Sequence, residues 1–224
     1  MASSPRVRSV LDHSIDEIRN DILRMGSFIG EQIANAVQAL KNRDLSLAHQ
    51  VVESDRRINE LRYRVELKCV HTIATQQPAA KDLRYIIAAI HIAGELERMA
   101  DHANGIASIT IRIGDEPLVK PLIDIPRMQE VACEMLKGAL DAFVQVNAEA
   151  AKAVAVRDEE VDELYAQVLR ELLTYMMQDQ KTITQSTYLL WVAHNLERIA
   201  DRAINLCERV IFAATAELGD YKPR

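Results

Sequence analysis

Two pairs of acidic residues, one hundred positions apart, have the types and spacing most suited to chemistry. The pattern Leu-Glu-Arg-x-Ala-Asp occurs twice and places Glu97 four residues before Asp101, and Glu197 four residues before Asp201. Carboxylates at this spacing share one face of a helix and repel each other, so a cation between them would stabilise both. A single pair is a weak signal, because 33 acidic residues in 224 give roughly five such pairs by chance.

Each acidic pair lies within an apolar helical pattern. Ile90, Ala93 and Ala100 flank Glu97 at helical spacing, and the second copy repeats this arrangement around Glu197. A carboxylate beside apolar residues is costly to bury unless a partner neutralises it. The alternative is that both pairs belong to solvated helix faces.

The residues that face the first pair follow from the geometry of a helical hairpin. In an antiparallel hairpin, facing residues lie at equal distances from the turn. Asp55 and Asp101 are equidistant from Pro78, and so are Asn59 and Glu97. Pro78 also marks the turn independently, because proline cannot continue a helix. The first copy is therefore predicted to bring three carboxylates and one amide together.

The second copy predicts a fully acidic quartet. Asp158 faces Asp201, and Asp162 faces Glu197, about a turn between positions 179 and 180. Four side-chain oxygens on facing helices suit hard cations, so we predict a metal site at each quartet, for iron, manganese, magnesium or zinc. The sequence contains no Glu-x-x-His pair, His-Glu-x-x-His motif or Walker loop, and no catalytic residue is assigned.

The apolar periodicity and the prolines define the elements that position these acids. Three prolines predict a linker over 113–126 between copies at 10–112 and 127–218. The recurrence of apolar residues every three or four positions predicts three helices in each copy, with approximate spans 12–42, 45–75, 80–112, 127–145, 148–177 and 182–217. Short connections make successive helices antiparallel. The predicted fold is all-α, a tandem duplication of two antiparallel three-helix bundles with six long helices.

Composition limits the class of protein. Hydrophobic residues make up 49%, charged residues 27%, and the net charge is −6, which is typical of a globular protein and unfavourable for nucleic-acid binding. No stretch is long and apolar enough for membrane insertion, and no secretory signal is visible. Cys69, Cys133 and Cys207 are an odd number without Cys-x-x-Cys spacing, which indicates free thiols in a reducing compartment. We expect a cytoplasmic protein.

The repeated segments resemble those of the PhoU family, the phosphate-uptake regulators of bacteria. The resemblance covers nearly the whole chain and rests on three kinds of motif. These are the repeated signature at 96–103 and 196–203, Gln-Pro-Ala-Ala-Lys-Asp-Leu-Arg at 77–84, and Arg-Met-Gly at 24–26. The resemblance implies two three-helix bundles in tandem, in agreement with the periodicity.

The resemblance also implies metal ligands and a regulatory role. The family's metal-binding motifs map onto Glu97 with Asp101 and onto the second repeated pair, while Asn59 departs from the acidic pattern. The implied role is repression of the phosphate-starvation response and restraint of phosphate uptake, without enzymatic activity. The implied partners are the ATPase subunit of a phosphate ABC transporter, a sensor histidine kinase and a second copy of the chain in a homodimer.

Two alternatives remain open at this point. One is a metal-dependent hydrolase that uses the carboxylates, although no nucleophile or general base can be identified. The other is a structural helical adaptor with solvated acids and no metal. Arg98 and Arg198, inside the motif, either neutralise the acids or form surface salt bridges worth at most about 1 kcal/mol. His102 is expected to be solvated, because its counterpart in the second copy is Arg202.

Overall fold

Eight α-helices and one short 3-10 helix make up the computed structural model, which describes residues 5–217 and the side chains of residues 10–217. The helices are α1 (Pro5–Asn42), α2 (Leu45–Glu53), α3 (Asp55–Gln76), α4 (Ala80–Ile113), α5 (Asp124–Gln145), α6 (Ala148–Ala155), α7 (Asp158–Gln178), η1 (Gln180–Thr182) and α8 (Ile183–Thr215). Six are long, and no strand occurs among the described residues, so the predicted all-α fold is confirmed. Residue 218, the predicted end of the second copy, lies outside the described residues.

The middle helix of each copy, predicted as continuous, is broken at the same place. The span 45–75 is divided into α2 and α3 at Ser54, and the span 148–177 is divided into α6 and α7 at residues 156–157. Ser54 and Arg157 are equivalent residues of the two copies. The prediction of one helix in each span was therefore wrong, and the break itself belongs to the repeated unit.

The breaks determine where the first quartet acid of each copy lies. The Ser54 hydroxyl lies 2.7 Å from the Val51 carbonyl oxygen and 2.9 Å from Oε1 of Gln32, so it binds groups on both α2 and α1. Directly after each break, Asp55 and Asp158 are the first residues of α3 and α7. The positive end of a helix dipole favours a carboxylate at this position.

The connection between the copies is shorter than predicted. α4 ends at Ile113, followed by Gly114, whose positive φ of +66° is a backbone angle that favours glycine. α5 begins at Asp124, so Pro126 lies in its first turn, where the missing N–H of proline is tolerated. The connection therefore spans 114–123 rather than 113–126.

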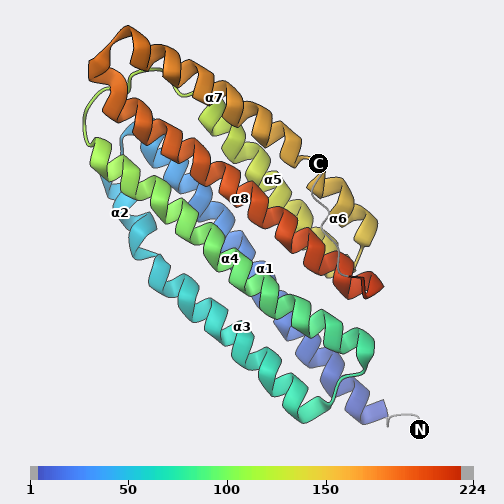
Figure 1. Ribbon diagram of the computed structural model, residues 1–224. Helices are drawn as coiled ribbons and strands as arrows, with labels where there is room; N and C mark the ends of the chain where they lie inside the picture. Colours follow the sequence, from blue (N-terminus) through green and yellow to red (C-terminus); the bar gives the residue numbers. More distant parts are fainter. Residues whose placement is uncertain (1–4, 218–224) are drawn as a thin grey trace.

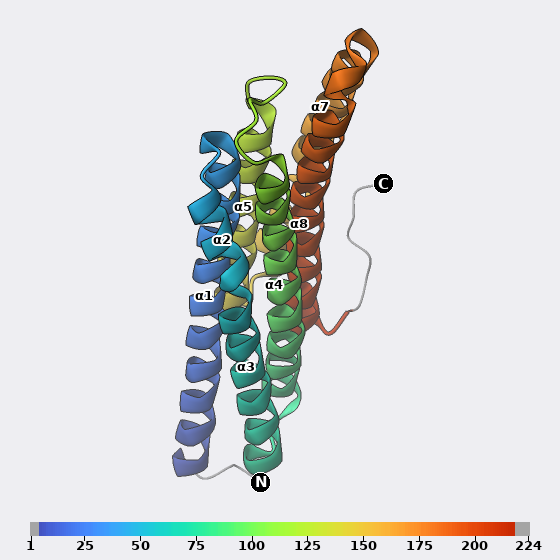
Figure 2. The ribbon, with the colours of Figure 1, turned by 90° about the vertical axis from the view of Figure 1, so that its left-hand side faces the viewer.

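One hydrophobic core runs through both copies. α4 and α8 lie antiparallel in the centre and form the most extensive helix–helix contact, and α1 packs against α5 (Figure 1). Figure 2 shows the helices running along one long direction, with α1 and α3 on one side and α7 and α8 on the other. No helix in the described part of the chain has the length and hydropathy to cross a membrane.

Equivalent residues of the two copies make equivalent contacts across the α4–α8 interface. His102 Nδ1 of α4 lies 3.0 Å from Asn195 Oδ1 of α8. Arg202 of α8 lies 3.3 Å from Glu95 of α4. Residues 102 and 202 are equivalent in the two copies, and so are residues 95 and 195. The contact between 102 and 195 is therefore the counterpart of the contact between 202 and 95. The copies are therefore related by an approximate two-fold axis, and His102 belongs to the interface rather than to solvent as we expected.

Candidate metal centres

In the first quartet, the Asp55 carboxylate accepts hydrogen bonds from two amides. Asn59 Nδ2 donates to Asp55 Oδ2 over 3.1 Å, and Asn104 Nδ2 of α4 donates to Asp55 Oδ1 over 3.0 Å. Among the described side chains, Asn104 Oδ1 is one of the few buried polar atoms without a hydrogen-bond partner. Asn59 is thus turned toward Asp55 of its own helix, and Asn104 connects α4 to the quartet.

The remaining acids of the first quartet lie beside an arginine from the opposite helix. Nη1 of Arg62 on α3 lies 3.3 Å from Glu97 Oε2 on α4, and the same arginine donates to Glu66 over 2.8 Å. Burial and then Asp101 raise the pKa of Glu97, while Arg62 opposes them. Burial and then Asp55 raise the pKa of Asp101. Asp55 and Asp101, predicted to face each other, are therefore close enough to repel.

Two acids of the second quartet are more deeply buried than their counterparts in the first, whereas Asp162 is exposed and its counterpart Asn59 is half-buried. Asp158 at the start of α7 and Asp201 on α8 are each 7% exposed, whereas Asp55 is half-buried and Asp101 is exposed. Arg198 Nη1 donates to Asp201 Oδ2 over 2.8 Å. Buried carboxylates require compensating charge or hydrogen bonds, and Arg198 supplies part of that compensation at Asp201.

Glu197 contains the least satisfied oxygen of the second quartet. Its Oε2 lies 3.4 Å from Arg198 Nε and 3.5 Å from His194 Nδ1, yet within the described residues this buried atom accepts no hydrogen bond. Burial, then Asp201 and more weakly Asp162, raise the pKa of Glu197, while Arg198 and His194 lower it. Asp162 on α7 and Glu197 on α8 therefore interact across the hairpin, in the predicted direction.

The side chains are compatible with a metal ion but do not already form a closed cage. Among residues 10–217, no three His, Cys, Asp or Glu side chains are placed closely enough to enclose an ion. Two observations fit a hard cation: Asn104 Oδ1 and Glu197 Oε2 lack hydrogen-bond donors, and the raised carboxyl pKa values mark repulsion that positive charge would relieve. The two metal sites therefore stay predictions.

Three side chains that contact the quartets were not selected from the sequence. They are Arg62, Asn104 and His194, and their counterparts in the other copy are Tyr165, Ile204 and Gly94. Because none is repeated, a comparison of the copies could not find them. Helical spacing could have found two, since Asn104 follows Asp101 by three residues and His194 precedes Glu197 by three.

The fold and the quartets define a class of protein: a duplicated three-helix bundle with an acidic cluster between the last two long helices of each copy. A family model described as PhoU domain matches residues 22–110 and again residues 125–210. This double match corresponds to the two copies found in the sequence and the structure.

Individual relatives and solved structures agree with the family model. The chain is 36% identical to the phosphate-specific transport system accessory protein PhoU homolog of Rhizobium meliloti, over 95% of this chain and 90% of that protein. It is 41% identical to the protein of the same name from Caulobacter vibrioides, over 91% of this chain and 90% of that one.

Among solved structures, the phosphate transport system regulatory protein PhoU from Streptococcus pneumoniae superposes with a TM-score of 0.87 at 31% identity, covering 94% of this chain and 99% of that one. PhoU from Pseudomonas aeruginosa gives a TM-score of 0.86 at 35% identity, with coverage of 92% and 99%. The chain belongs to the PhoU family.

Proposed function

We propose that this protein is a cytoplasmic accessory and regulatory protein of phosphate uptake. It acts with the ATPase subunit of a phosphate ABC transporter and with a sensor histidine kinase, restrains uptake and represses the phosphate-starvation response. A homodimer is the proposed working assembly. The proposal is supported by membership of the PhoU family and by relatives whose names describe them as accessory to a phosphate-specific transport system.

Metal binding at the quartets is part of the proposal. Asp55, Glu97 and Asp101, with the amide of Asn59, would hold an ion in the first copy, and the four acids of the second quartet would hold one in the second. A bound divalent or transition metal ion supplies positive charge between facing helices. The carboxylates would then fix α3 against α4 and α7 against α8, and so hold the outer surfaces of α3 and α7 in one arrangement for partners.

The observation that carries the metal-binding part is the set of facing acids with an unsatisfied, buried carboxylate oxygen. Glu197 Oε2 is that oxygen, and the carboxylates of Asp162 and Asp201 both raise the pKa of Glu197. Purely solvated acids, as in a metal-free structural adaptor, would still repel each other, but burial would not raise the pKa of one of them as it does at Glu197.

The test removes the charges of the second quartet without changing side-chain shape. The variant Glu197→Gln/Asp201→Asn is purified without chelator, its metal content is measured by elemental analysis, and its binding to the ATPase subunit and to the kinase is measured. We expect metal content to fall and partner affinity to weaken by about tenfold or more, equivalent to about 1.4 kcal/mol. The control is Asp12→Asn/Asp16→Asn, an exposed acidic pair of the same spacing on α1, which should change neither.

The outcomes separate the remaining alternatives. Unchanged metal content and partner binding in the quartet variant would refute the metal-binding part and favour a structural adaptor. Reduced metal content with unchanged partner binding would show that the metal does not organise the partner surface. Hydrolysis of phosphate esters by the metal-loaded protein, absent in the quartet variant, would instead favour the hydrolase.

A further inference from the structure

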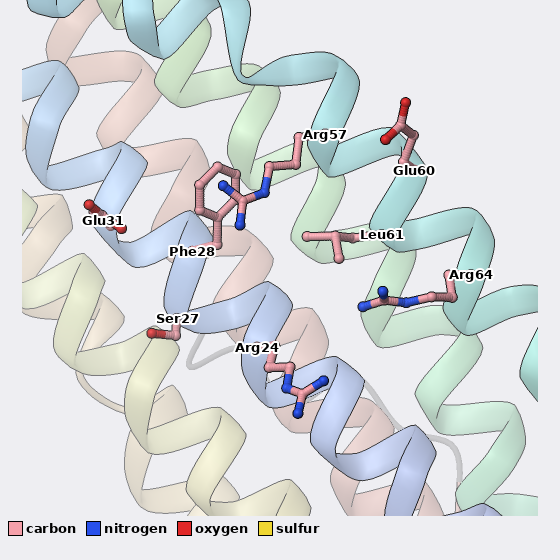
Figure 3. Close-up of a pocket in the computed structure, with 8 residues that line it drawn as sticks. All are labelled: Arg24, Ser27, Phe28, Glu31, Arg57, Glu60, Leu61 and Arg64. Atoms are coloured by element: carbon pink, nitrogen blue, oxygen red, sulfur yellow. The ribbon is translucent and has the colours of Figure 1, made fainter.

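A groove of about 670 Å³ runs between α1 and α3 on the surface of the first copy, apart from the quartets (Figure 3). Phe28 of α1 and Leu61 of α3 form its apolar part. Three arginines extend into it, Arg24 from α1 and Arg57 and Arg64 from α3. The groove therefore combines an apolar floor with positive charge from both walls.

The positive charge of the groove is in excess over its nearby acids. The Arg57 guanidinium lies 4.4 Å from the centre of the Phe28 ring and has no carboxylate within salt-bridge distance among the described residues. Arg64 lies 3.3 Å from Asp21, but Lys68 already pairs with that carboxylate at 2.7 Å. Arg57 is therefore available to an external anion, and so are the N–H groups of Arg64 that do not contact Asp21 Oδ1.

The two acids that border the groove do not neutralise the arginines. Glu60 pairs with Arg56 at 3.2 Å, and in Figure 3 its carboxylate points away from α1. Glu31 lies on the side of α1 that faces away from α3 (Figure 3). Both glutamates line the groove, but among the described residues neither lies within salt-bridge distance of Arg24, Arg57 or Arg64.

The equivalent groove of the second copy has lost this character. Between α5 and α7, Arg127 keeps the position of Arg24, but Glu160 and Gln167 replace Arg57 and Arg64. Arg127 lies 3.6 Å from Glu160, so its charge is compensated within the groove. The cationic groove is therefore a property of the first copy alone and supplies a matched internal control.

An exposed apolar row beside the groove indicates a macromolecular ligand. Tyr63, Leu67 and Val70 are 57%, 71% and 59% exposed and share the outer face of α3 at helical spacing. Leu67 follows Arg64 by three residues, so the row borders the groove. A small anion would leave these side chains in water, whereas a docked protein segment would bury them.

We propose that the α1–α3 groove binds an acidic amphipathic helix of a partner protein. Arg57 and Arg64 are seven residues apart on α3, which separates their backbones by about 10 Å. Two carboxylates two turns apart on the partner helix would each pair with one guanidinium, a strong charge-assisted interaction. Apolar residues beside those carboxylates would cover Leu67 and its neighbours, the helix-in-groove mode of recognition.

This inference rests on the proposed role as a protein that acts through partners, but it does not require metal. The probe is a fluorescent helical peptide of about 16 residues, long enough to form a helix, with two glutamates seven residues apart and leucines beside them. A control peptide carries glutamines in place of the glutamates. Binding is measured by fluorescence anisotropy with the full chain.

Two reciprocal variants exchange the grooves. Arg57→Glu/Arg64→Gln gives the first groove the side chains of the second, and we expect it to weaken binding of the acidic peptide by about tenfold or more. Both arginines are exposed, so circular dichroism should show unchanged folding. Glu160→Arg/Gln167→Arg gives the second groove the arginines of the first, but Ala166 and Arg170 stand in place of Tyr63 and Leu67, so it should add a second site that is weaker than the first. The wild-type affinity should fall with added salt.

Equal binding of the glutamine peptide, or wild-type affinity in Arg57→Glu/Arg64→Gln, would overturn the proposal. Two results together would also overturn it: inorganic tripolyphosphate displaces the peptide, and a peptide with alanines in place of its leucines binds with unchanged affinity. These results would identify a small-anion site. A change in sedimentation of Arg57→Glu/Arg64→Gln without peptide would assign the groove to a second copy and also contradict it. If the peptide binds as expected but Glu197→Gln/Asp201→Asn keeps its metal content and partner binding, only the metal-binding part of the proposed function is rejected.

Discussion

The two quartets differ in the charge that faces them. In the first, Arg62 crosses from α3 to Glu97 at 3.3 Å, whereas the equivalent residue in the second copy is Tyr165, whose ring centre lies 6.3 Å from that of His194. In the first, one ligand position is the amide Asn59, whereas the second has Asp162. The first quartet thus has fewer acids and a cation supplied by the facing helix.

The arginines inside the repeated motif differ in the opposite sense. Arg98 donates to Glu95 over 2.7 Å, because a carboxylate precedes it by three residues. In the second copy that position is Asn195, and Arg198 donates to the quartet acid Asp201 instead. Duplication has preserved the acidic pairs while their surroundings have diverged. The second quartet nevertheless has four acids where the first has three and an amide, and is expected on that ground to bind metal more tightly.

The largest expected effect separates the two quartets directly. Asp158→Asn/Asp162→Asn should weaken the tightest Mn²⁺ binding by about a hundredfold, because it removes two of four charged oxygen ligands. Asp55→Asn/Glu97→Gln should leave the tightest binding unchanged. Isothermal titration calorimetry of the chelator-treated variants measures both. Equal losses in the two variants would remove the proposed difference.

The next largest effect is expected at the interface between the copies, where two equivalent substitutions should lower the free energy of unfolding by different amounts. Glu95 accepts from Asn205 over 2.8 Å and lies 3.3 Å from Arg202, whereas its counterpart Asn195 contacts His102. Glu95→Ala leaves a partly buried cation without its partner and should lower the free energy of unfolding by about 2 kcal/mol.

The matched change Asn195→Ala removes a neutral hydrogen bond and should lower the free energy of unfolding by about 1 kcal/mol. Urea unfolding monitored by circular dichroism measures both values. A larger loss in Asn195→Ala than in Glu95→Ala would contradict the assignment of the charged contact as the stronger one.

A smaller effect should follow from making the first quartet resemble the second. Asn59→Asp/Arg62→Tyr adds a carboxylate and removes the competing guanidinium. We expect Mn²⁺ affinity at the first quartet to rise by about tenfold, measured by calorimetry in a background where the second quartet carries Asp158→Asn/Asp162→Asn. No increase would show that another feature limits the first site.

The smallest expected effect is the pH dependence of stability without metal. The pKa of Glu197 is raised in the folded state, so the folded protein holds this proton more tightly than the unfolded chain. Above the raised pKa, the ionised Glu197 therefore destabilises the folded state to its full extent. This destabilisation is relieved as the pH falls through the raised pKa toward the ordinary carboxyl value of about 4.3.

The metal-free protein should consequently become more stable to thermal unfolding as the pH is lowered from neutral toward the ordinary carboxyl pKa. Glu197→Gln should reduce this increase more than Glu97→Gln does, since the facing carboxylate of Asp162 adds to the raised pKa of Glu197, whereas Asn59 at the equivalent position carries no charge. The reverse order of the two variants would contradict the difference in facing charge.

The sequence predicted what depends on periodicity and on a single hairpin turn. Equidistance from Pro78 placed Asp55 near Asp101, because two helices joined by a tight turn keep a fixed register, and the pKa of Asp101 reflects this proximity. The break at Ser54 was missed, because serine is tolerated inside helices and its hydrogen bond to Gln32 is a tertiary contact. The pairing of α4 with α8 was also missed, since nothing in one copy specifies how it packs on the other.

The cationic groove could not be predicted for a related reason. The groove is lined by arginines that are separated in sequence, Arg24, Arg57 and Arg64. In the sequence alone they are indistinguishable from ordinary solvated charges, because only the packing of α1 against α3 brings them together. Comparison of the two copies revealed the quartets because their acids are retained. The same comparison would have revealed the groove through the residues that differ, Glu160 in place of Arg57 and Gln167 in place of Arg64.

Anomalous X-ray scattering from crystals soaked in Mn²⁺ tests the central difference between the quartets most directly. At limiting ion concentration, the account predicts a peak between α7 and α8, bounded by Asp158, Asp162, Glu197 and Asp201, with a weaker peak or none between α3 and α4. An equal or stronger peak at Asp55, Glu97 and Asp101, or no peak at either quartet at saturating ion, would contradict it.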